Sequence, residues 1–381
     1  MAYDFDYAIV GGGLQAGLLA LAIRAEQPGA RVAIVEHGAA LGGNHTWCFH
    51  AGDTGADMEW LEPLVVGRWA GYDVAFPAHR RTLASPYAYV TSERLDHCVR
   101  GVVDELWLGN PATEIGPHRV ATASRAMTAV VVIDTRGPDH LPAGRSGWQT
   151  FVGREVHVPG HGLAHPMVMD ATVEQRDAFT FMYVLPLAPD RLLIEDTAFA
   201  DAPYLDVARG RQAISHYANL RGWDLREVVR EETGILPLPL ALDPALPTRS
   251  PLIAGYAGGW FHPVTGYSFP IAARLASIVA GLGPEALFGP ELATHAAAHH
   301  AQLAFATRLN RMLFGWFQPR DRYHVLERFY RLPEARIRRF YALQQTAVDR
   351  ARMFLGRPPR GLSWHAMLES LRPIARPEVP S

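Results

Sequence analysis

The 381-residue chain contains only two cysteines, Cys48 and Cys98, and they do not form a CxxC pair. Two isolated thiols cannot build the disulfide framework of a small secreted protein, and they lack the spacing of a thiolate metal site. His295 and His299 lie four residues apart on an expected helix, but no third ligand is evident, so we predict no metal site. This composition fits a protein of the reducing cytoplasm.

The chain also lacks a net positive charge and an uninterrupted hydrophobic segment. Its formal charge is −2, whereas nucleic-acid-binding proteins usually carry a marked positive excess, so we expect no nucleic-acid partner. The uncharged stretch at residues 251–273 contains several prolines and glycines, which makes it a poor membrane-spanning helix. Residues 1–10 carry acidic residues and no basic segment, unlike a signal peptide. We therefore expect a folded protein without a transmembrane segment.

The N-terminal sequence predicts a βαβ unit that binds a dinucleotide. An apolar strand at residues 7–10 leads through a glycine-rich turn into a helix over residues 18–25, and a second apolar strand follows at residues 32–35. Such glycines permit a tight turn and a close approach to a pyrophosphate, which lies at the helix N-terminus. An acidic residue after the second strand is placed to bind a ribose. The expected cofactor-binding residues of this unit are Gly11, Gly13, Leu14, Ala16 and Glu36.

A second glycine-rich segment favours FAD over NAD as the dinucleotide. Flavoproteins commonly place the βαβ unit at the N-terminus and return late in the chain with a glycine-rich segment that closes over the cofactor. Residues 254–267 occupy that position. The acidic residue that many flavoproteins use to hold the ribityl chain is absent, and Tyr256 lies near the expected place. From this segment we expect cofactor contacts by Gly258, Gly259, Thr265 and Gly266.

The rest of the chain has a different pattern. Residues 179–185 and 191–196 predict two strands of a hairpin within a substrate-facing sheet. Apolar residues at helical spacing predict helices over residues 292–316 and 323–343, with a break at Pro333. The expected fold is α/β, a Rossmann-type FAD-binding flavoprotein with a mixed β-sheet substrate domain and C-terminal helices. The expected parts are a discontinuous FAD-binding region (1–146 and 233–290), the substrate-binding sheet (147–232) and a helical C-terminal region (291–381).

An acidic pair, Glu195 and Asp196, follows the apolar residues 192–194 in the second strand of this hairpin. Burying an ionised carboxylate is costly, so a carboxyl in such a setting keeps a raised pKa and becomes available as a proton donor. The alternative is that the two residues end a strand and enter a turn. The pair by itself leaves both interpretations open.

Several segments together resemble the bacterial lycopene β-cyclases of carotenoid biosynthesis. They are residues 11–15 (GGGLQ), 41–47 (LGGNHTW), 166–171 (PMVMDA) with Val173 and Gln175, 183–186 (YVLP), 194–197 (IEDT) and 259–270. The family's phenylalanine-leucine-glutamate-aspartate-threonine run corresponds to residues 193–197 (LIEDT), in which only the apolar half is changed. Because these segments span most of the chain, the resemblance covers the whole protein.

The resemblance implies an enzyme that binds FAD and needs it reduced, with NAD(P)H as the electron source. It would close a β-ionone ring at each end of lycopene, through γ-carotene to β-carotene, with no net redox change. Protonation of the terminal alkene gives a carbocation, the neighbouring double bond attacks it, and loss of a proton completes the ring. Such a site needs an acid, a base and stabilisation of the cation.

Glu195 is the expected acid or cation stabiliser, with Asp196 in support. An anionic reduced flavin could instead stabilise the cation or deliver the proton. His45, in the LGGNHTW segment, is either a residue that positions a proton or touches the flavin, or a structural histidine. Aromatic rings suit a polyene through packing and cation–π attraction. The expected substrate contacts are Trp47, Phe181, Tyr183, Trp260 and Tyr267.

Because lycopene resides in the bilayer, the resemblance also implies a peripheral enzyme on the cytoplasmic face of the membrane, with other carotenoid enzymes as further candidate partners. Between residues 308 and 360, thirteen arginines and four acidic residues give a balance of +9. We expect these helices to bind anionic headgroups while burying apolar side chains in the bilayer. The alternative is a helical cap with solvated or paired arginines. The apolar residues are Met312, Leu313, Phe314, Trp316, Phe317, Phe329 and Phe340.

Two other functions remain open for this sequence. One is a redox flavoprotein, such as a hydroxylase or a prenyl-chain reductase, with the same cofactor unit. The other is a catalytically silent flavin-dependent protein that binds membranes. The acidic pair favours acid chemistry over both, because neither hydride transfer nor lipid docking requires it.

Overall fold

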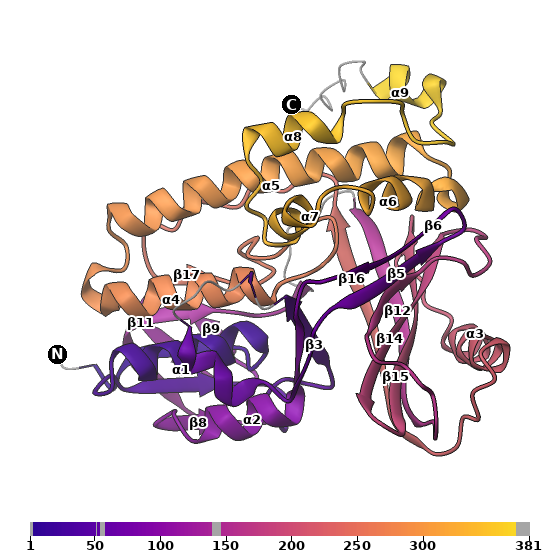
Figure 1. Cartoon of the computed structure of the whole chain (residues 1–381). Helices are drawn as coiled ribbons and strands as arrows, with labels where there is room; N and C mark the ends of the chain where they lie inside the picture. The colour runs from indigo at the N-terminus through magenta and orange to yellow at the C-terminus, as the bar shows by residue number, and fades with distance from the viewer. Residues whose placement is uncertain (1–2, 51, 54–57, 139–145, 371–381) are drawn as a thin grey trace.

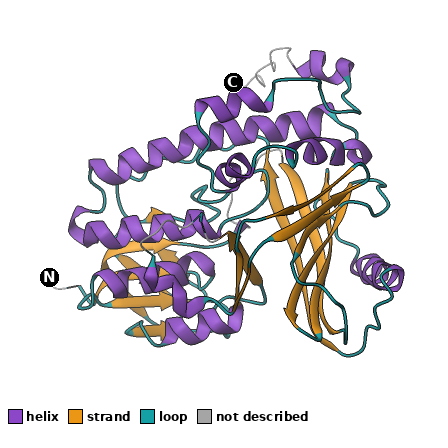
Figure 2. Ribbon diagram, in the orientation of Figure 1, coloured by secondary structure: helices purple, strands orange, loops and turns teal. Residues whose placement is uncertain are grey.

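The structure, a computed structural model, describes residues 3–50, 52–53, 58–138 and 146–370. Two large sheets lie side by side, and the long helix α5 (Pro290–Trp316) extends above both of them (Figure 1). The strands of the two sheets and the helices above them are distinguished by colour in Figure 2. The predicted α/β class with C-terminal helices is confirmed.

The first sheet has seven strands in the order β8-β2-β1-β11-β10-β9, and β17 also pairs with β11. The pairs among β1, β2, β8, β11 and β17 are parallel, as the βαβ pattern predicts, and β10 pairs antiparallel with β9 and β11. Strands β1 and β2 are continuous apolar runs because both of their faces are buried. The bounds are β1 (Phe5–Val10), β2 (Val32–Val35), β8 (Glu105–Trp107), β9 (Glu114–Ile115), β10 (Arg119–Ala121), β11 (Ala126–Asp134) and β17 (Leu252–Ile253).

Two apolar helices, α1 (Leu14–Glu26) and α4 (Phe269–Ala286), pack against each other beside this sheet. Helix α1 begins at Leu14, before the expected start at residue 18, and it includes Gly17. A Cβ atom at Gly17 would lie 2.6 Å from Leu95 Cδ1 of α2 (Ser92–Arg100). Glycine therefore allows the two helices to pack closely behind the dinucleotide-type turn.

The second sheet has seven strands in the order β16-β12-β15-β14-β13-β5-β6. All its pairs are antiparallel except β13 with β5, and the predicted hairpin is confirmed as β14 and β15. The sheet extends beyond the expected residues 147–232, because it recruits β5 and β6 from the N-terminal part and β16 continues to Pro239. The bounds are β5 (Tyr72–Phe76), β6 (His79–Leu83), β12 (Ser146–His157), β13 (Met167–Asp170), β14 (Phe179–Ala188), β15 (Arg191–Ala200) and β16 (Val228–Pro239).

One face of the second sheet is covered by α3 (Val207–Leu220). Val152 of β12 and Ile194 of β15 are buried together with Ile214 and Tyr217 of this helix. A three-stranded sheet, in the order β3-β7-β4, completes the β structure. Its bounds are β3 (Thr46–His50), β4 (Gly67–Trp69) and β7 (Tyr87–Thr91), and the short helix η1 (Glu59–Leu64) precedes β4.

The C-terminal helices follow the predicted pattern with one division. Helix α5 covers the expected residues 292–316, whereas residues 323–343 form two helices, because Pro333 lacks the N–H that would continue the first one. Within the described ranges, no helix is long and apolar enough to cross a membrane. The remaining bounds are η3 (Pro319–Asp321), α6 (Tyr323–Phe329), α7 (Glu334–Tyr341), α8 (Ala347–Met353) and α9 (Trp364–Ser370).

Four of the apolar residues expected to enter a bilayer are instead part of the hydrophobic core. Leu313, Phe317, Phe329 and Phe340 are all buried, whereas Met312, Phe314 and Trp316 are half-buried. The prediction of membrane insertion is therefore wrong for the four buried residues, because the helices turn these side chains inward. The exposed large apolar side chains of this region are Val348, Phe354, Leu355, Trp364 and Leu368.

Candidate active site

A cavity of about 860 Å³ lies between the two large sheets. Its walls come from the β1–α1 turn, from β3, from the cavity face of β14, β15 and β16, and from the loop that leads into α4. The dinucleotide-type turn and the predicted substrate sheet therefore open into one space. A ligand bound at the turn can meet a second molecule that lies on the sheet.

The β1–α1 turn forms one wall of this cavity. Gly11 has φ +100°, and a Cβ atom there would lie 2.9 Å from Thr135 Oγ1, so the turn needs glycine at this position. Glu36, which is 8% exposed, accepts hydrogen bonds from the backbone N–H groups of Gly12 at 2.5 Å and Gly38 at 2.6 Å. Four of the predicted cofactor residues of this unit line the cavity: Gly11, Gly13, Leu14 and Glu36.

Only part of the late glycine-rich segment, residues 254–267, lines the cavity. Thr265 and Gly266 line the cavity, and Tyr256 donates its hydroxyl hydrogen to the carbonyl of Gly266 at 2.6 Å. Gly258 and Gly259 do not line it. A Cβ atom at Gly258 would lie 2.1 Å from the Ile253 carbonyl oxygen, so this glycine permits a tight backbone turn.

The fifth residue predicted from the βαβ unit, Ala16, is fully buried inside α1 and also does not line the cavity. Its small side chain belongs to the core that packs α1 against its neighbours. The structure thus brings six of the nine predicted cofactor residues together, whereas Ala16, Gly258 and Gly259 do not line the cavity.

The cavity contains polar atoms that fit a dinucleotide. Gln15 Oε1, Gln149 Oε1 and Thr197 Oγ1 belong to residues that line it, and all three are buried without a hydrogen-bond partner among the described residues. Buried polar atoms are rarely left unpaired in native proteins. Together with the backbone N–H groups at the start of α1, they provide the donors and acceptors that a bound dinucleotide would use.

The acidic pair is divided between the two faces of the second sheet. Side chains alternate along β15, so Glu195 and Thr197 line the cavity whereas Ile194 packs on the α3 side. Asp196 shares the face of Ile194 and does not line the cavity. The predicted support of Glu195 by Asp196 within one site does not match this placement.

The carboxyl of Asp196 lies on the α3 side of the sheet, where neighbouring groups offset only part of the cost of its burial. Burial raises the pKa of Asp196 to about 6, and the charge of Arg209 on α3 opposes that rise only in part. Its Oδ1 atom is buried and accepts no hydrogen bond from the described residues. The raised pKa thus follows from desolvation on the face away from the cavity.

A second glutamate, which the sequence analysis missed, lies beside Glu195. Gly153 of β12, the strand between β15 and β16, pairs with Glu195 on one side and with Glu232 on the other. Burial, the charge of Glu232 and a hydrogen bond between the two carboxyls raise the pKa of Glu195 well above its usual value. Arg230 donates a hydrogen bond to the Glu232 carboxylate at 2.7 Å and forms an ion pair with it.

Two side chains of the LGGNHTW segment and β3 approach this pair. His45 lines the cavity, and burial lowers its pKa although the charge of Glu232 acts in the opposite direction. Cys48 also lines the cavity, and burial raises the pKa of its thiol to about 12. Both groups are therefore neutral at pH 7, and the ion pair between Arg230 and Glu232 lies near Glu195.

All five predicted aromatic substrate residues line the cavity: Trp47, Phe181, Tyr183, Trp260 and Tyr267. The structure adds His50, Tyr87 and Tyr341, whose rings pack together, with 4.8 Å between the ring centres of His50 and Tyr87. Tyr87 and Tyr183 share a hydrogen bond of 3.1 Å between their hydroxyls. Such a wall suits an apolar chain and attracts a cation through the faces of its rings.

One member of the histidine pair of α5, His299, packs against the late glycine-rich segment. His299 stacks on Trp260 with 4.5 Å between ring centres, and its Nε2 lies 2.8 Å from the Gly259 carbonyl oxygen. These contacts fix the ring of His299 against the late glycine-rich segment. The histidine thus supports one wall of the cavity from behind.

Several cavity residues were not predicted from the sequence, and they differ in whether a local pattern marks them. Glu232 lies in residues 231–233 (EET), which repeat the acid-acid-threonine pattern of residues 195–197 (EDT). This repetition on two strands that flank β12 is a signal that could have found it. His50, Tyr87 and Tyr341 come from three distant segments, and only the fold brings them together.

Comparisons with known proteins agree with this architecture. The family described as "Lycopene cyclase protein" matches residues 6–367. The lycopene beta-cyclase of Pseudescherichia vulneris is 42% identical over 376 residues, which cover 95% of this chain and 97% of that protein.

Solved structures with low sequence identity share the fold. A geranylgeranyl bacteriochlorophyll reductase-like protein from Thermoplasma acidophilum has a TM-score of 0.61 at 12% identity, covering 92% of this chain and 95% of that one. A halogenase, PltM, in complex with FAD has a TM-score of 0.60 at 15% identity, covering 86% and 79%. The fold is therefore that of FAD-dependent enzymes. By its sequence match over nearly its whole length, the chain belongs to the lycopene cyclase protein family.

Proposed function

We propose that this protein is a lycopene β-cyclase that converts lycopene through γ-carotene to β-carotene. The observation that carries the proposal is Glu195, a buried carboxyl whose pKa is raised well above its usual value and which lines an aromatic cavity next to the dinucleotide-type turn. A neutral carboxyl in an apolar cavity is suited to protonate an alkene. Membership of the lycopene cyclase family supports the same substrate.

The proposed cofactor is FAD in its reduced form, with NAD(P)H as the electron source. The residues that would hold it are Gly11, Gly13, Leu14, Glu36, Thr265 and Gly266, all of which line the cavity. When bound, a reduced flavin supplies negative charge and an electron-rich ring near a carbocation. The unpaired oxygens of Gln15 and Gln149 would find partners on the cofactor.

In the proposed mechanism, Glu195 transfers its proton to the terminal alkene of the polyene. The neighbouring double bond attacks the resulting tertiary carbocation and closes the ring, and an adjacent ring carbon then returns a proton to the Glu195 carboxylate. The faces of Tyr183 and Phe181 stabilise the positive charge while it exists. The atoms of the substrate are only rearranged, so the enzyme is an isomerase that acts as an intramolecular lyase, with no net redox change.

The redox alternative shares the fold but not this site. Hydride transfer from a flavin does not require a carboxyl with a raised pKa, whereas ring closure by protonation does. The Glu195–Glu232 arrangement therefore favours the cyclase over a reductase or hydroxylase.

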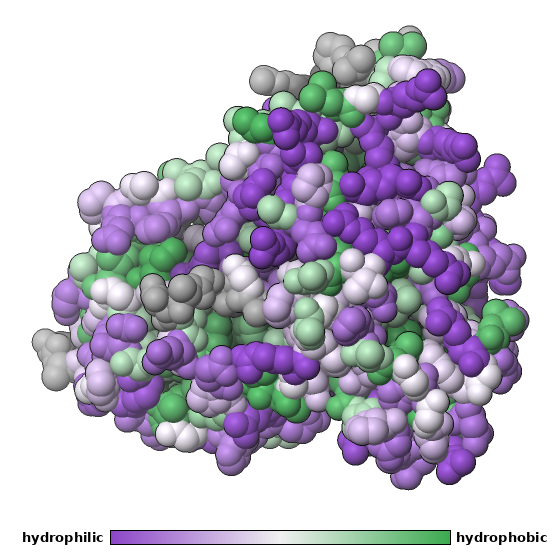
Figure 3. All heavy atoms as spheres, in the orientation of Figure 1, coloured by the Kyte–Doolittle hydropathy of each residue, from purple (hydrophilic) through white to green (hydrophobic). Residues whose placement is uncertain are grey.

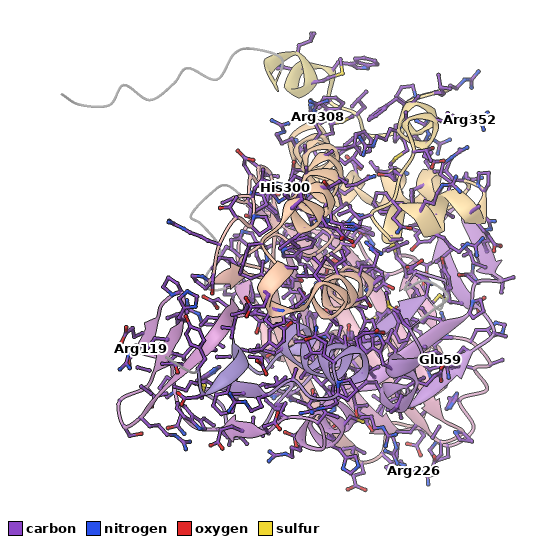
Figure 4. The ribbon with its side chains drawn as sticks, turned by 90° about the vertical axis from the view of Figure 1, so that its left-hand side faces the viewer. Glu59, Arg119, Arg226, His300, Arg308 and Arg352 are labelled. Carbon is purple, nitrogen blue, oxygen red and sulfur yellow. The ribbon has the colours of Figure 1, made fainter. Side chains whose placement is uncertain are left out.

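We further propose that the C-terminal helices dock on the cytoplasmic face of an anionic membrane, from which lycopene enters. Hydrophobic residues at the top of the molecule are visible over α8 and α9 (Figure 3). Exposed arginines, including Arg308 and Arg352, lie in the same upper region (Figure 4). Exposed apolar groups among basic residues are typical of peripheral membrane binding. Other carotenoid enzymes at this surface would be the next partners.

The test is expression in a bacterium that accumulates lycopene, followed by identification of the pigment. We expect bicyclic β-carotene, with γ-carotene at short times. The Glu195→Gln variant should keep its FAD but lose nearly all conversion, because the amide has no acidic proton. The control is Glu59→Gln, since Glu59 is exposed on the surface (Figure 4). Unchanged lycopene in the presence of folded, flavin-loaded wild-type protein would refute the proposal.

A further inference from the structure

A glycine in β12, the strand between β15 and β16, lets two carboxyls meet across it. Glu195 and Glu232 lie on the strands that flank β12, and both pair with Gly153. A Cβ atom at Gly153 would lie 2.8 Å from Glu195 Cγ and 3.1 Å from Glu232 Cγ. Any other residue at this position would push the two side chains apart. The glycine therefore creates the space in which the carboxyls touch.

The two carboxyls have unequal surroundings. Glu232 is 3% exposed and lies 2.7 Å from Arg230 Nη1. Arg230 is itself fixed by Thr46 Oγ1 at 2.6 Å and by Asn44 Oδ1 at 3.0 Å. Glu195 forms no ion pair with the described residues, although the charge of Arg230 acts on it from a distance, and it faces the cavity. Arg230 thus favours negative charge on Glu232, whereas burial disfavours ionisation of Glu195.

Two carboxyls in contact cannot both be ionised at modest cost, so such pairs hold one proton between them. The other titratable groups around the pair are His45 just before β3, Cys48 on β3 and Tyr183 on β14. Burial keeps all three neutral near pH 7. The protonation of the pair is therefore determined by its own two carboxyls and Arg230.

We propose that Glu232 is the positioning partner of the acid: it shares one proton with Glu195 across Gly153, and Arg230 directs that proton to the cavity side. The inference rests on the proposed cyclisation. The O–H bond of Glu195 breaks as a C–H bond forms on the alkene. A ring C–H bond then breaks, and its proton returns to the pair, which is restored with one proton. No proton is consumed, and the doubly ionised pair stabilises the carbocation in between.

The first experiment compares Glu232→Gln with Glu155→Gln in the purified full-length protein. Both substitutions remove a carboxylate that contacts Arg230, at 2.7 Å and 3.3 Å, but only Glu232 shares a hydrogen bond with the Glu195 carboxyl. Infrared difference titration of the protonated carboxyl band should show its pKa lowered by about one unit or more in Glu232→Gln, because a like charge is removed. Glu155→Gln should leave the band unchanged.

The same variants are assayed with lycopene in liposomes. The alkaline limb of the pH profile of kcat should move to lower pH in Glu232→Gln, with KM and FAD content unchanged. A Glu232→Gln band that titrates as in the wild type would overturn the proposal. If the band shifts in Glu232→Gln but the wild-type protein never cyclises lycopene, the proposal of a shared proton stands and the proposed function is refuted.

A second variant tests the pair with both carboxyls present. Gly153→Ala should separate them and move the infrared band in the same direction as Glu232→Gln. Gly210→Ala is the matched control, because its Cβ would press on Val152 of the same sheet at 2.6 Å but from the α3 side. If both alanine variants fold and show the same band as the wild type, the carboxyls do not share a proton across Gly153.

Discussion

Replacing Asp196 by asparagine should make the protein more stable at neutral pH. The carboxyl of Asp196 lies on the α3 side of β15, its Oδ1 has no hydrogen-bond partner among the described residues, and burial raises its pKa from 3.8 to about 6. An uncharged amide of nearly the same shape avoids the cost of the buried charge. The substitution therefore removes a penalty and leaves the packing intact.

The size of the effect follows from the pKa. One pKa unit corresponds to about 1.4 kcal/mol, so a rise of about two units weakens folding by at most about 3 kcal/mol when the group is ionised in both states. Because Asp196 is only half-buried, we expect about 2 kcal/mol after screening. For a chain of this length that is a change in Tm of roughly 2 to 3 °C.

The difference in stability between Asp196→Asn and the wild type should depend on pH, in a direction set by the two pKa values of Asp196. Below pH 3.8 the folded and unfolded chains both keep the proton, so the two proteins should be equally stable. Between pH 3.8 and about 6 only the unfolded wild-type chain releases it, and wild-type stability falls as pH rises. The stability advantage of Asp196→Asn should therefore grow over this interval and stay constant above pH 7.

Thermal unfolding from pH 4 to pH 8 measures this difference. Asp224→Asn is the control, because the Asp224 side chain is 71% exposed. The pigment assay on Asp196→Asn should also show normal conversion, since the carboxyl does not line the cavity. A stability difference that does not change with pH would contradict the explanation by burial, and loss of cyclisation would return Asp196 to the reaction.

Two further predictions concern the cofactor and the membrane. Gly11→Ala should lower FAD affinity at least about tenfold in a fluorescence titration, because φ +100° and the contact with Thr135 exclude a side chain; Gly29→Ala, in open space, should bind FAD normally. Leu355→Asn with Trp364→Ser should reduce co-sedimentation with anionic vesicles at low salt, since these residues are 67% and 61% exposed. Binding that ignores both the substitutions and the lipid charge would refute the docking surface.

The local sequence determined the nucleotide-binding part of the fold. Continuous apolar runs at β1 and β2, with a glycine turn and an acidic residue at the right spacing, specify a parallel βαβ unit because each signal acts over a few residues. The hairpin β14–β15 and the division before α7 at Pro333 were predictable for the same reason. The family segments were also visible without any structure.

Only the tertiary structure determined the surroundings of the acidic pair. The pair Glu195 and Asp196 looks like one site in the sequence, but β15 continues to Ala200, so alternation sends the two carboxyls to opposite faces. Which face is the cavity depends on where α3 packs. The partnership with Glu232 depends on the register of three strands around Gly153, which joins residues far apart in the chain.

The C-terminal region shows the same limit. Helices α5, α6 and α7 were predicted from their periodicity, whereas α8 and α9 were not. The sequence could not tell which aromatic residues are exposed, because both a membrane and a protein core accept apolar side chains. The fold buries Phe329 and Phe340 and leaves Trp364 exposed. Periodicity and turn chemistry are encoded locally, whereas burial, register and the meeting of charges arise only when distant segments pack together.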